Sequence, residues 1–142
     1  MGHWVFLGKQ SGRLVYFDSF AIAPENYSDV FGDLSRRYKD KGLFLNISKR
    51  LQSSESLVCG AYVLWIASTF SSKGLDGTVH AIATYFSPDK LSNDKKVLKY
   101  VYRNFRLPDC RKMFCEGTAN YLTCIKRYCT DRFSPDDSPR YI

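Results

Sequence analysis

The chain has 142 residues, of which 44% are hydrophobic, 15% aromatic and 25% charged. This composition excludes an intrinsically disordered protein and predicts one folded domain that buries roughly two thirds of its unfolded surface. No apolar run reaches the ~18–20 residues that span a bilayer, and no signal-peptide pattern opens the chain, so we expect a soluble protein that is not secreted and does not contact membranes. A net charge of +7 favours polyanionic partners, although solubility alone also explains it.

The five cysteines are an odd number, which favours free thiols in a reducing compartment over a disulfide framework. Four of them form two i, i+5 pairs near the end of the chain: Cys110, Cys115, Cys124 and Cys129. Because a helix predicted over 118–132 directs such pairs to different sides, zinc and a disulfide are minor alternatives and no metal ligand is assigned. We expect a single domain over 1–142, with a core at 2–105, a helical extension at 106–133 and a loose tail at 134–142.

Two short runs rich in aromatic and β-branched residues, 3–7 and 13–17, predict a hairpin. A turn centred on residues 10–11 puts His3 directly opposite Asp18, within reach of a hydrogen bond. Both faces of this hairpin are apolar, so we expect its sheet to be covered on both sides. The predicted fold class is α+β, with a small, mostly antiparallel sheet between helices.

Further elements follow in order. Residues 24–41 predict a helix, and the alternating pattern of 43–51 predicts a third strand. Apolar residues at every fourth position predict a core helix over 58–70, followed by a break at 71–77 and a short apolar segment at 79–86.

Residues 89–105 predict an amphipathic helix with a basic outer face. Four lysine and arginine residues lie on this face and a fifth lies just past its end, and together they form a candidate DNA-binding patch: Lys95, Lys96, Lys99, Arg103 and Arg106. An ordinary solvated helix face has the same pattern.

Cys59 lies in the first turn of the predicted core helix, where the helix dipole favours thiolate over thiol. Gly60 leaves room for a substrate backbone, and the amide of Gln52 can join the Cys59 N–H in an oxyanion hole. His3 is then the candidate general base, and Asp18 fixes its tautomer. A buried cysteine at a helix start is also common without function, so the assignment depends on the whole set.

Three motifs carry a resemblance to a known family: Gly2-His3-Trp4, the strand end at 16–20, and the Gln-x6-Cys-Gly spacing from Gln52. Over residues 2–105 they resemble the adenovirus protease (adenain) family and, more distantly, the SUMO-deconjugating cysteine proteases of the same fold. The resemblance implies a cysteine endopeptidase that cleaves viral capsid and core precursors in the virion and the host nucleus. It assigns His3, Asp18, Cys59 and Gln52 to catalysis, and Trp4 and Gly60 to substrate binding.

The resemblance also implies stimulation by DNA and by a short viral peptide tethered through a cysteine. Because no cysteine lies between Asp18 and Gln52, the peptide cofactor gains little support, and the chemistry itself requires no cofactor. The family has a substantial portion before its histidine, whereas here only Met1 and Gly2 precede His3, so the expected fold is N-terminally truncated. We expect a monomer.

Three alternatives remain open at this stage. A SUMO or ubiquitin-like deconjugase on the same scaffold differs only in its substrate. A papain-like hydrolase pairs Cys59 with His80, which follows the cysteine in the chain. A non-catalytic DNA- or capsid-binding protein keeps the protease-like fold and the basic helix.

Overall fold

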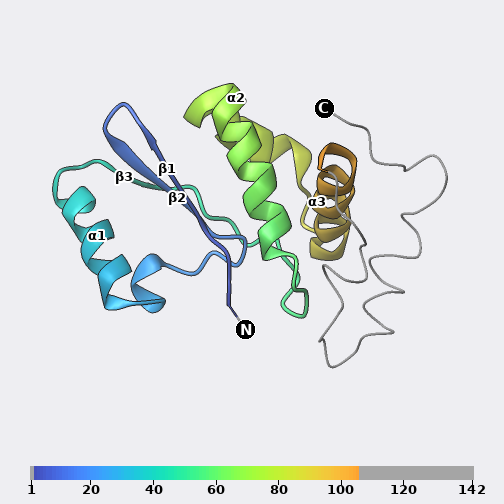
Figure 1. Cartoon of the computed structure of the whole chain (residues 1–142), viewed down its shortest axis with the longest axis horizontal. Helices are drawn as coiled ribbons and strands as arrows, with labels where there is room; N and C mark the ends of the chain where they lie inside the picture. Colours follow the sequence, from blue (N-terminus) through green and yellow to red (C-terminus); the bar gives the residue numbers. More distant parts are fainter. Residues whose placement is uncertain (1, 106–142) are drawn as a thin grey trace.

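A three-stranded sheet lies between two helices in the computed structural model, which describes residues 2–105 (Figure 1). Its strands are β1 (Phe6–Gln10), β2 (Arg13–Phe17) and β3 (Phe44–Asn46), in the order β1-β2-β3. The pair β1–β2 is antiparallel and the pair β2–β3 is parallel. The α+β class is confirmed, but the sheet is mixed rather than mostly antiparallel, because a helical crossover returns the chain to β3 in the direction of β2.

The hairpin turn consists of Ser11 and Gly12, both with positive φ (52° and 78°), as in the type I′ turn that joins two twisted strands. Phe6 therefore pairs with Phe17, and the predicted register, which placed His3 opposite Asp18 in the ladder, is wrong by two positions. A displacement of two keeps every side chain on its predicted face of the sheet.

The helix predicted over 24–41 is divided into a short 3₁₀ helix, η1 (Pro24–Asn26), and α1 (Asp29–Asp40). The division occurs because Ser28 caps α1, its side chain accepting a hydrogen bond from the backbone N–H of Phe31 at 3.1 Å. Gly42 follows the end of α1 with φ +67°, a conformation that favours glycine.

The longest helix, α2 (Cys59–Tyr85), contains the break that the sequence predicted over 71–77, reduced to a kink at Gly74 (φ 69°). The side chain of Gln10 on β1 accepts the Leu75 N–H at 2.8 Å and so replaces a helical partner lost at the kink. The segment predicted at 79–86 is therefore not separate, since most of it forms the last turns of α2.

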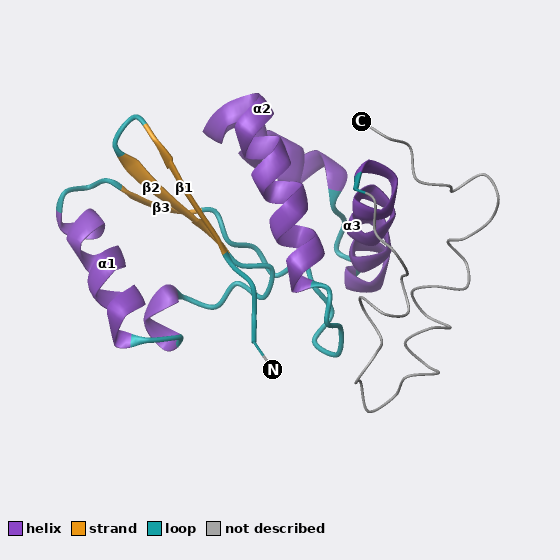
Figure 2. Ribbon diagram, in the orientation of Figure 1, coloured by secondary structure: helices purple, strands orange, loops and turns teal. Residues whose placement is uncertain are grey.

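The last described helix is α3 (Lys90–Asn104), which packs against α2 (Figure 2). The sheet is covered on both faces, as predicted: Tyr16 contacts Phe31 of α1 and Phe44 of β3, whereas Phe17 joins the core formed with α2 and α3. No helix within 2–105 is both long and apolar enough to cross a membrane. The predicted extension, the tail, Arg106 and the four late cysteines lie outside the described residues.

Candidate active site

His3 and Asp18 form the hydrogen bond that the sequence predicted, with His3 Nε2 at 2.8 Å from Asp18 Oδ1. The bond forms outside the strand ladder, between the segment that precedes β1 and the turn that follows β2. Because an ionised carboxylate only accepts hydrogen bonds, Nε2 must carry the proton and the lone pair of a neutral imidazole is then on Nδ1. Nδ1 is therefore the nitrogen that can accept a proton.

Asp18 is fully buried, and its carboxylate is surrounded by donors besides His3. Oδ1 also accepts the N–H of Phe20 at 2.8 Å, while Oδ2 accepts the N–H of Ile22 at 3.3 Å and the hydroxyl of Tyr27. These donors compensate for the loss of water and fix the plane of the carboxylate. A buried, oriented acceptor is what a tautomer-fixing carboxylate requires.

The residue after Asp18 holds the candidate oxyanion donor. The backbone oxygen of Ser19 accepts the N–H groups of Leu51 and Gln52 at 2.9 and 3.1 Å, and the Ser19 hydroxyl donates to Gln52 Oε1 at 2.6 Å. Gln52 Nε2 in turn donates to the Ser56 carbonyl at 2.9 Å. Within residues 2–105 the second Nε2 hydrogen of this fully buried amide has no hydrogen-bond partner.

Cys59 is the first residue of α2 and is 8% exposed, as a free thiol. No side chain caps this helix, and the Ala61 N–H donates to the Val58 carbonyl at 3.0 Å, so the leading N–H groups that can face an anion are those of Cys59 and Gly60. Among the described residues no hydrogen bond joins Cys59 to His3. The residues that follow them in the chain, Trp4 and Gly60, do lie side by side. A Cβ placed on Gly60 would be 3.7 Å from Trp4 Cδ1.

Tyr27 contacts both His3 and Asp18. Its ring stacks on His3, with ring centroids 5.6 Å apart. Burial raises the pKa of Tyr27, and the hydrogen bond to Asp18 and the charges of Asp18, Tyr16 and Cys59 raise it further.

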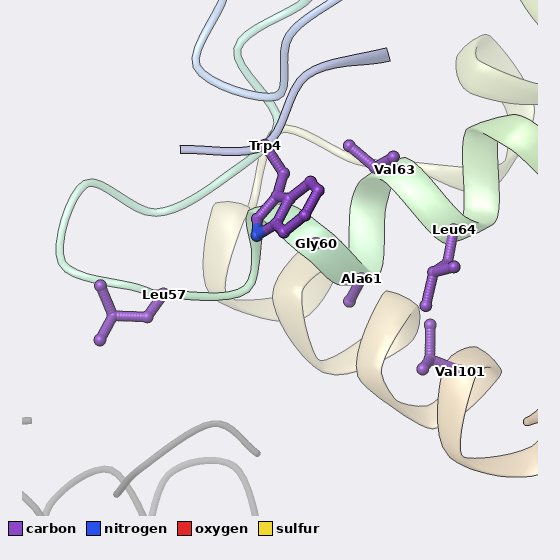
Figure 3. Close-up of a pocket in the computed structure, with 7 residues that line it drawn as sticks. All are labelled: Trp4, Leu57, Gly60, Ala61, Val63, Leu64 and Val101. Carbon is purple, nitrogen blue, oxygen red and sulfur yellow. The ribbon is translucent and has the colours of Figure 1, made fainter. Parts of the chain in front are cut away.

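An apolar pocket of about 390 Å³ is lined by Gly60 and Ala61, the two residues that follow Cys59 in α2. Figure 3 shows the indole of Trp4 over the first turn of α2, with Leu57 on the preceding loop and Val101 opposite on α3. Trp4 is 67% exposed despite its contact with Gly60, so the indole forms a wall of the pocket that a ligand can reach. The predicted substrate-binding pair thus lies at the mouth of a real cavity.

The side chains of the basic patch differ in exposure. Lys95, Lys99 and Arg103 follow one another at four-residue spacing along α3, and Lys99 is exposed. Lys96 instead donates to the carbonyl oxygen of Tyr85 at 2.9 Å, near the end of α2. Contact with DNA through this helix stays a prediction.

His80, the alternative base, is exposed and lies on α2 beyond the kink at Gly74. A helix rises ~1.5 Å per residue, so roughly 21 Å of helix separates Cys59 from the residue before the kink. This separation along the helix argues against His80 as the partner of Cys59. No group of three His, Cys, Asp or Glu side chains suited to a metal ion occurs in the described part of the chain.

Two residues of the site were missed by sequence reasoning. Ser19 was noted only as part of a strand-end motif, although a hydroxyl next to the candidate acid was a usable signal. Tyr27 lies within the single helix predicted over 24–41, because the sequence did not reveal the division between η1 and α1.

Comparison of the chain with protein-family models, with curated proteins and with solved structures gave no match. The function proposed below therefore depends on the geometry of the site and on the motif resemblance alone.

Proposed function

We propose that this protein is a cysteine peptidase of the adenain type, with Cys59 as nucleophile, His3 as general base and Asp18 as the residue that orients His3. The observation that carries this proposal is the hydrogen bond from His3 to a fully buried Asp18, next to a cysteine that opens an uncapped helix.

The proposed chemistry follows from the site. Nδ1 of His3 accepts the Cys59 thiol proton, and the thiolate attacks the carbonyl carbon of the scissile amide. The resulting oxyanion is held by the Cys59 N–H and the remaining N–H of Gln52. Collapse breaks the C–N bond, and the leaving amine takes the proton from the His3 imidazolium. Water, deprotonated by His3, then attacks the thioester, releases the acid and restores the thiol.

The pocket suggests how a substrate is selected. A peptide whose carbonyl lies at Cys59 runs along the exposed indole of Trp4, which itself lies within van der Waals distance of a Cβ placed on Gly60. An adjacent aliphatic side chain fits the apolar cavity lined by Leu57, Leu64 and Val101. Proteins with a small residue at the cleavage site and an apolar one nearby, such as the viral precursors that the resemblance implies, are the proposed substrates.

Mapping of thiol alkylation on the intact chain tests the proposal. We expect Cys59 to react with iodoacetamide about 10- to 50-fold faster than the other four cysteines at neutral pH, because an unactivated cysteine is only a few per cent thiolate there. The remaining cysteines are internal controls in the same sample. Equal labelling of all five, or protection of Cys59 alone, would contradict the assignment of the nucleophile.

The choice of substrate distinguishes an endopeptidase from a ubiquitin-like deconjugase. A glycine-rich fluorogenic peptide and a ubiquitin-like fusion protein are offered side by side. Cleavage of both supports an endopeptidase, whereas cleavage of the fusion alone supports a deconjugase.

Gln52 gives a second prediction. Gln52→Ala is expected to lower kcat about 10²–10³-fold with little change in KM, because an oxyanion donor acts only after the attack. Ser19→Ala, which removes the hydroxyl that fixes Gln52 Oε1, is expected to lower kcat only about tenfold. Steady-state kinetics on the peptide measure both effects. A Gln52→Ala protein with native turnover would remove this residue from the mechanism.

A further inference from the structure

Tyr27 contacts both members of the His3–Asp18 pair. Its hydroxyl donates to Asp18 Oδ2, and its ring is nearly parallel to the imidazole of His3, with 22° between the planes. Phe20 also stacks on His3, at 4.9 Å between ring centroids. Two aromatic rings and one carboxylate thus hold the His3 side chain in place.

The two oxygens of Asp18 have different partners. Oδ1 receives His3 Nε2–H and the N–H of Phe20, whereas Oδ2 receives the Tyr27 hydroxyl and the N–H of Ile22. The Tyr16 hydroxyl is a weaker donor to Oδ2, at 3.5 Å, because it also donates to the Ile22 carbonyl at 2.7 Å. The Tyr27 hydroxyl therefore occupies the oxygen that His3 does not use. Without this hydroxyl the carboxylate could rotate, and the imidazole could follow it or change tautomer.

The phenol is suited to this task because it stays protonated. Burial is the largest cause that raises the pKa of Tyr27, followed by its hydrogen bond to Asp18. A raised phenol pKa keeps the O–H present at all pH values below it, so Tyr27 remains a donor throughout the neutral range. Four charged or titratable groups surround the Tyr27 hydroxyl. They are Tyr16 on β2, Asp18 in the turn after β2, His3 before β1 and Cys59 at the start of α2.

We propose that Tyr27 is a positioning residue of this site: its hydroxyl fixes the Asp18 carboxylate and its ring fixes the His3 imidazole, so that Nδ1 is presented to Cys59. The catalytic consequence rests on the proposed peptidase function. The effect on the imidazole does not, because it can be observed without turnover.

The test uses the full chain with two substitutions that separate hydroxyl from ring. Tyr27→Phe keeps the ring and loses the donor, and Tyr27→Leu loses both. Tyr38→Phe on α1 is the matched control, since that tyrosine contacts Lys9 and not His3. Long-range ¹H–¹⁵N spectra report which ring nitrogen of His3 is protonated, and a His80→Gln background leaves His3 as the only histidine.

We expect the native His3 to be protonated on Nε2, with Nδ1 unprotonated. In Tyr27→Phe the other tautomer becomes detectable and Cys59 alkylation slows roughly 2- to 10-fold, the effect of one hydrogen bond. Tyr27→Leu slows alkylation further, whereas Tyr38→Phe changes neither the His3 tautomer nor the rate of Cys59 alkylation. An unchanged tautomer in a folded Tyr27→Phe protein would overturn the proposal. Where wild-type Cys59 is selectively alkylated, a changed tautomer with a native alkylation rate would overturn the part of the proposal in which Tyr27 acts on Cys59 through His3. Unselective alkylation of the wild type together with a changed tautomer in Tyr27→Phe would overturn the peptidase function but keep the positioning role.

Discussion

Replacing His3 with glutamine is expected to lower kcat/KM about 10²–10⁴-fold, the usual contribution of a general base. Glutamine retains a donor for Asp18 but cannot accept the Cys59 proton and carry the resulting charge. The selective alkylation of Cys59 should also disappear, because no imidazolium remains to stabilise the thiolate. Peptide hydrolysis and alkylation kinetics on the same preparation measure both losses.

The matched control is His80→Gln, which changes the only other histidine of the chain. His80 is exposed on the far part of α2, so we expect native activity from this variant. If His80→Gln were inactive and His3→Gln active, the papain-like pairing of Cys59 with His80 would replace the proposed one. If both variants were active, neither histidine would be the general base.

Asp18→Asn is expected to lower kcat about 10³–10⁴-fold and to destabilise the fold by about 1–3 kcal/mol. The new amide must turn its NH₂ toward one of two crowded positions. On one side it meets the N–H of Phe20 and on the other the N–H of Ile22, and neither backbone group can become an acceptor. If the NH₂ faces His3, the imidazole must also take the tautomer that leaves Nδ1 without a lone pair. Urea unfolding and steady-state kinetics measure the two effects.

Asp33→Asn provides the control for stability. Asp33 forms an exposed pair with Arg36 at 3.0 Å on α1, and such pairs contribute little in water. We expect its free energy of unfolding to stay within about 0.5 kcal/mol of the native value. Equal destabilisation by Asp18→Asn and Asp33→Asn would mean that the donors around Asp18 do not depend on its charge.

The site depends on one short turn more than on any single strand or helix. Asp18 and Ser19 are adjacent, and the first orients the candidate base while the second orients the candidate oxyanion donor. Ser48, in the segment after β3, accepts the backbone N–H of Asp18 at 2.9 Å and ties this turn to the rest of the sheet. A change in the turn should therefore alter both functions together.

The sequence by itself determined the parts of the fold that follow from local pattern. The apolar period of 58–70 predicted the core helix, and the turn residues and alternating side chains predicted a hairpin buried on both faces. Cys59 at a helix start and the His3–Asp18 contact were also predicted, because the motif residues lie close to the ends of those elements. The register was predicted two positions from the observed one, since local pattern alone did not select the Ser11–Gly12 turn.

Only the tertiary structure decided how these pieces meet. Contacts between residues far apart in the chain decide three features. They are the direction of β3, the continuation of α2 past Gly74 and the hydrogen bond from Ser19 to Gln52. Tyr27 shows the reason most clearly. Its neighbours in sequence predict an apolar helix face, but the turn after β2 brings a buried carboxylate to its hydroxyl and an imidazole to its ring. Side chains from separate segments share a site only when the packed core fixes their distances, and local periodicity carries no information about those distances.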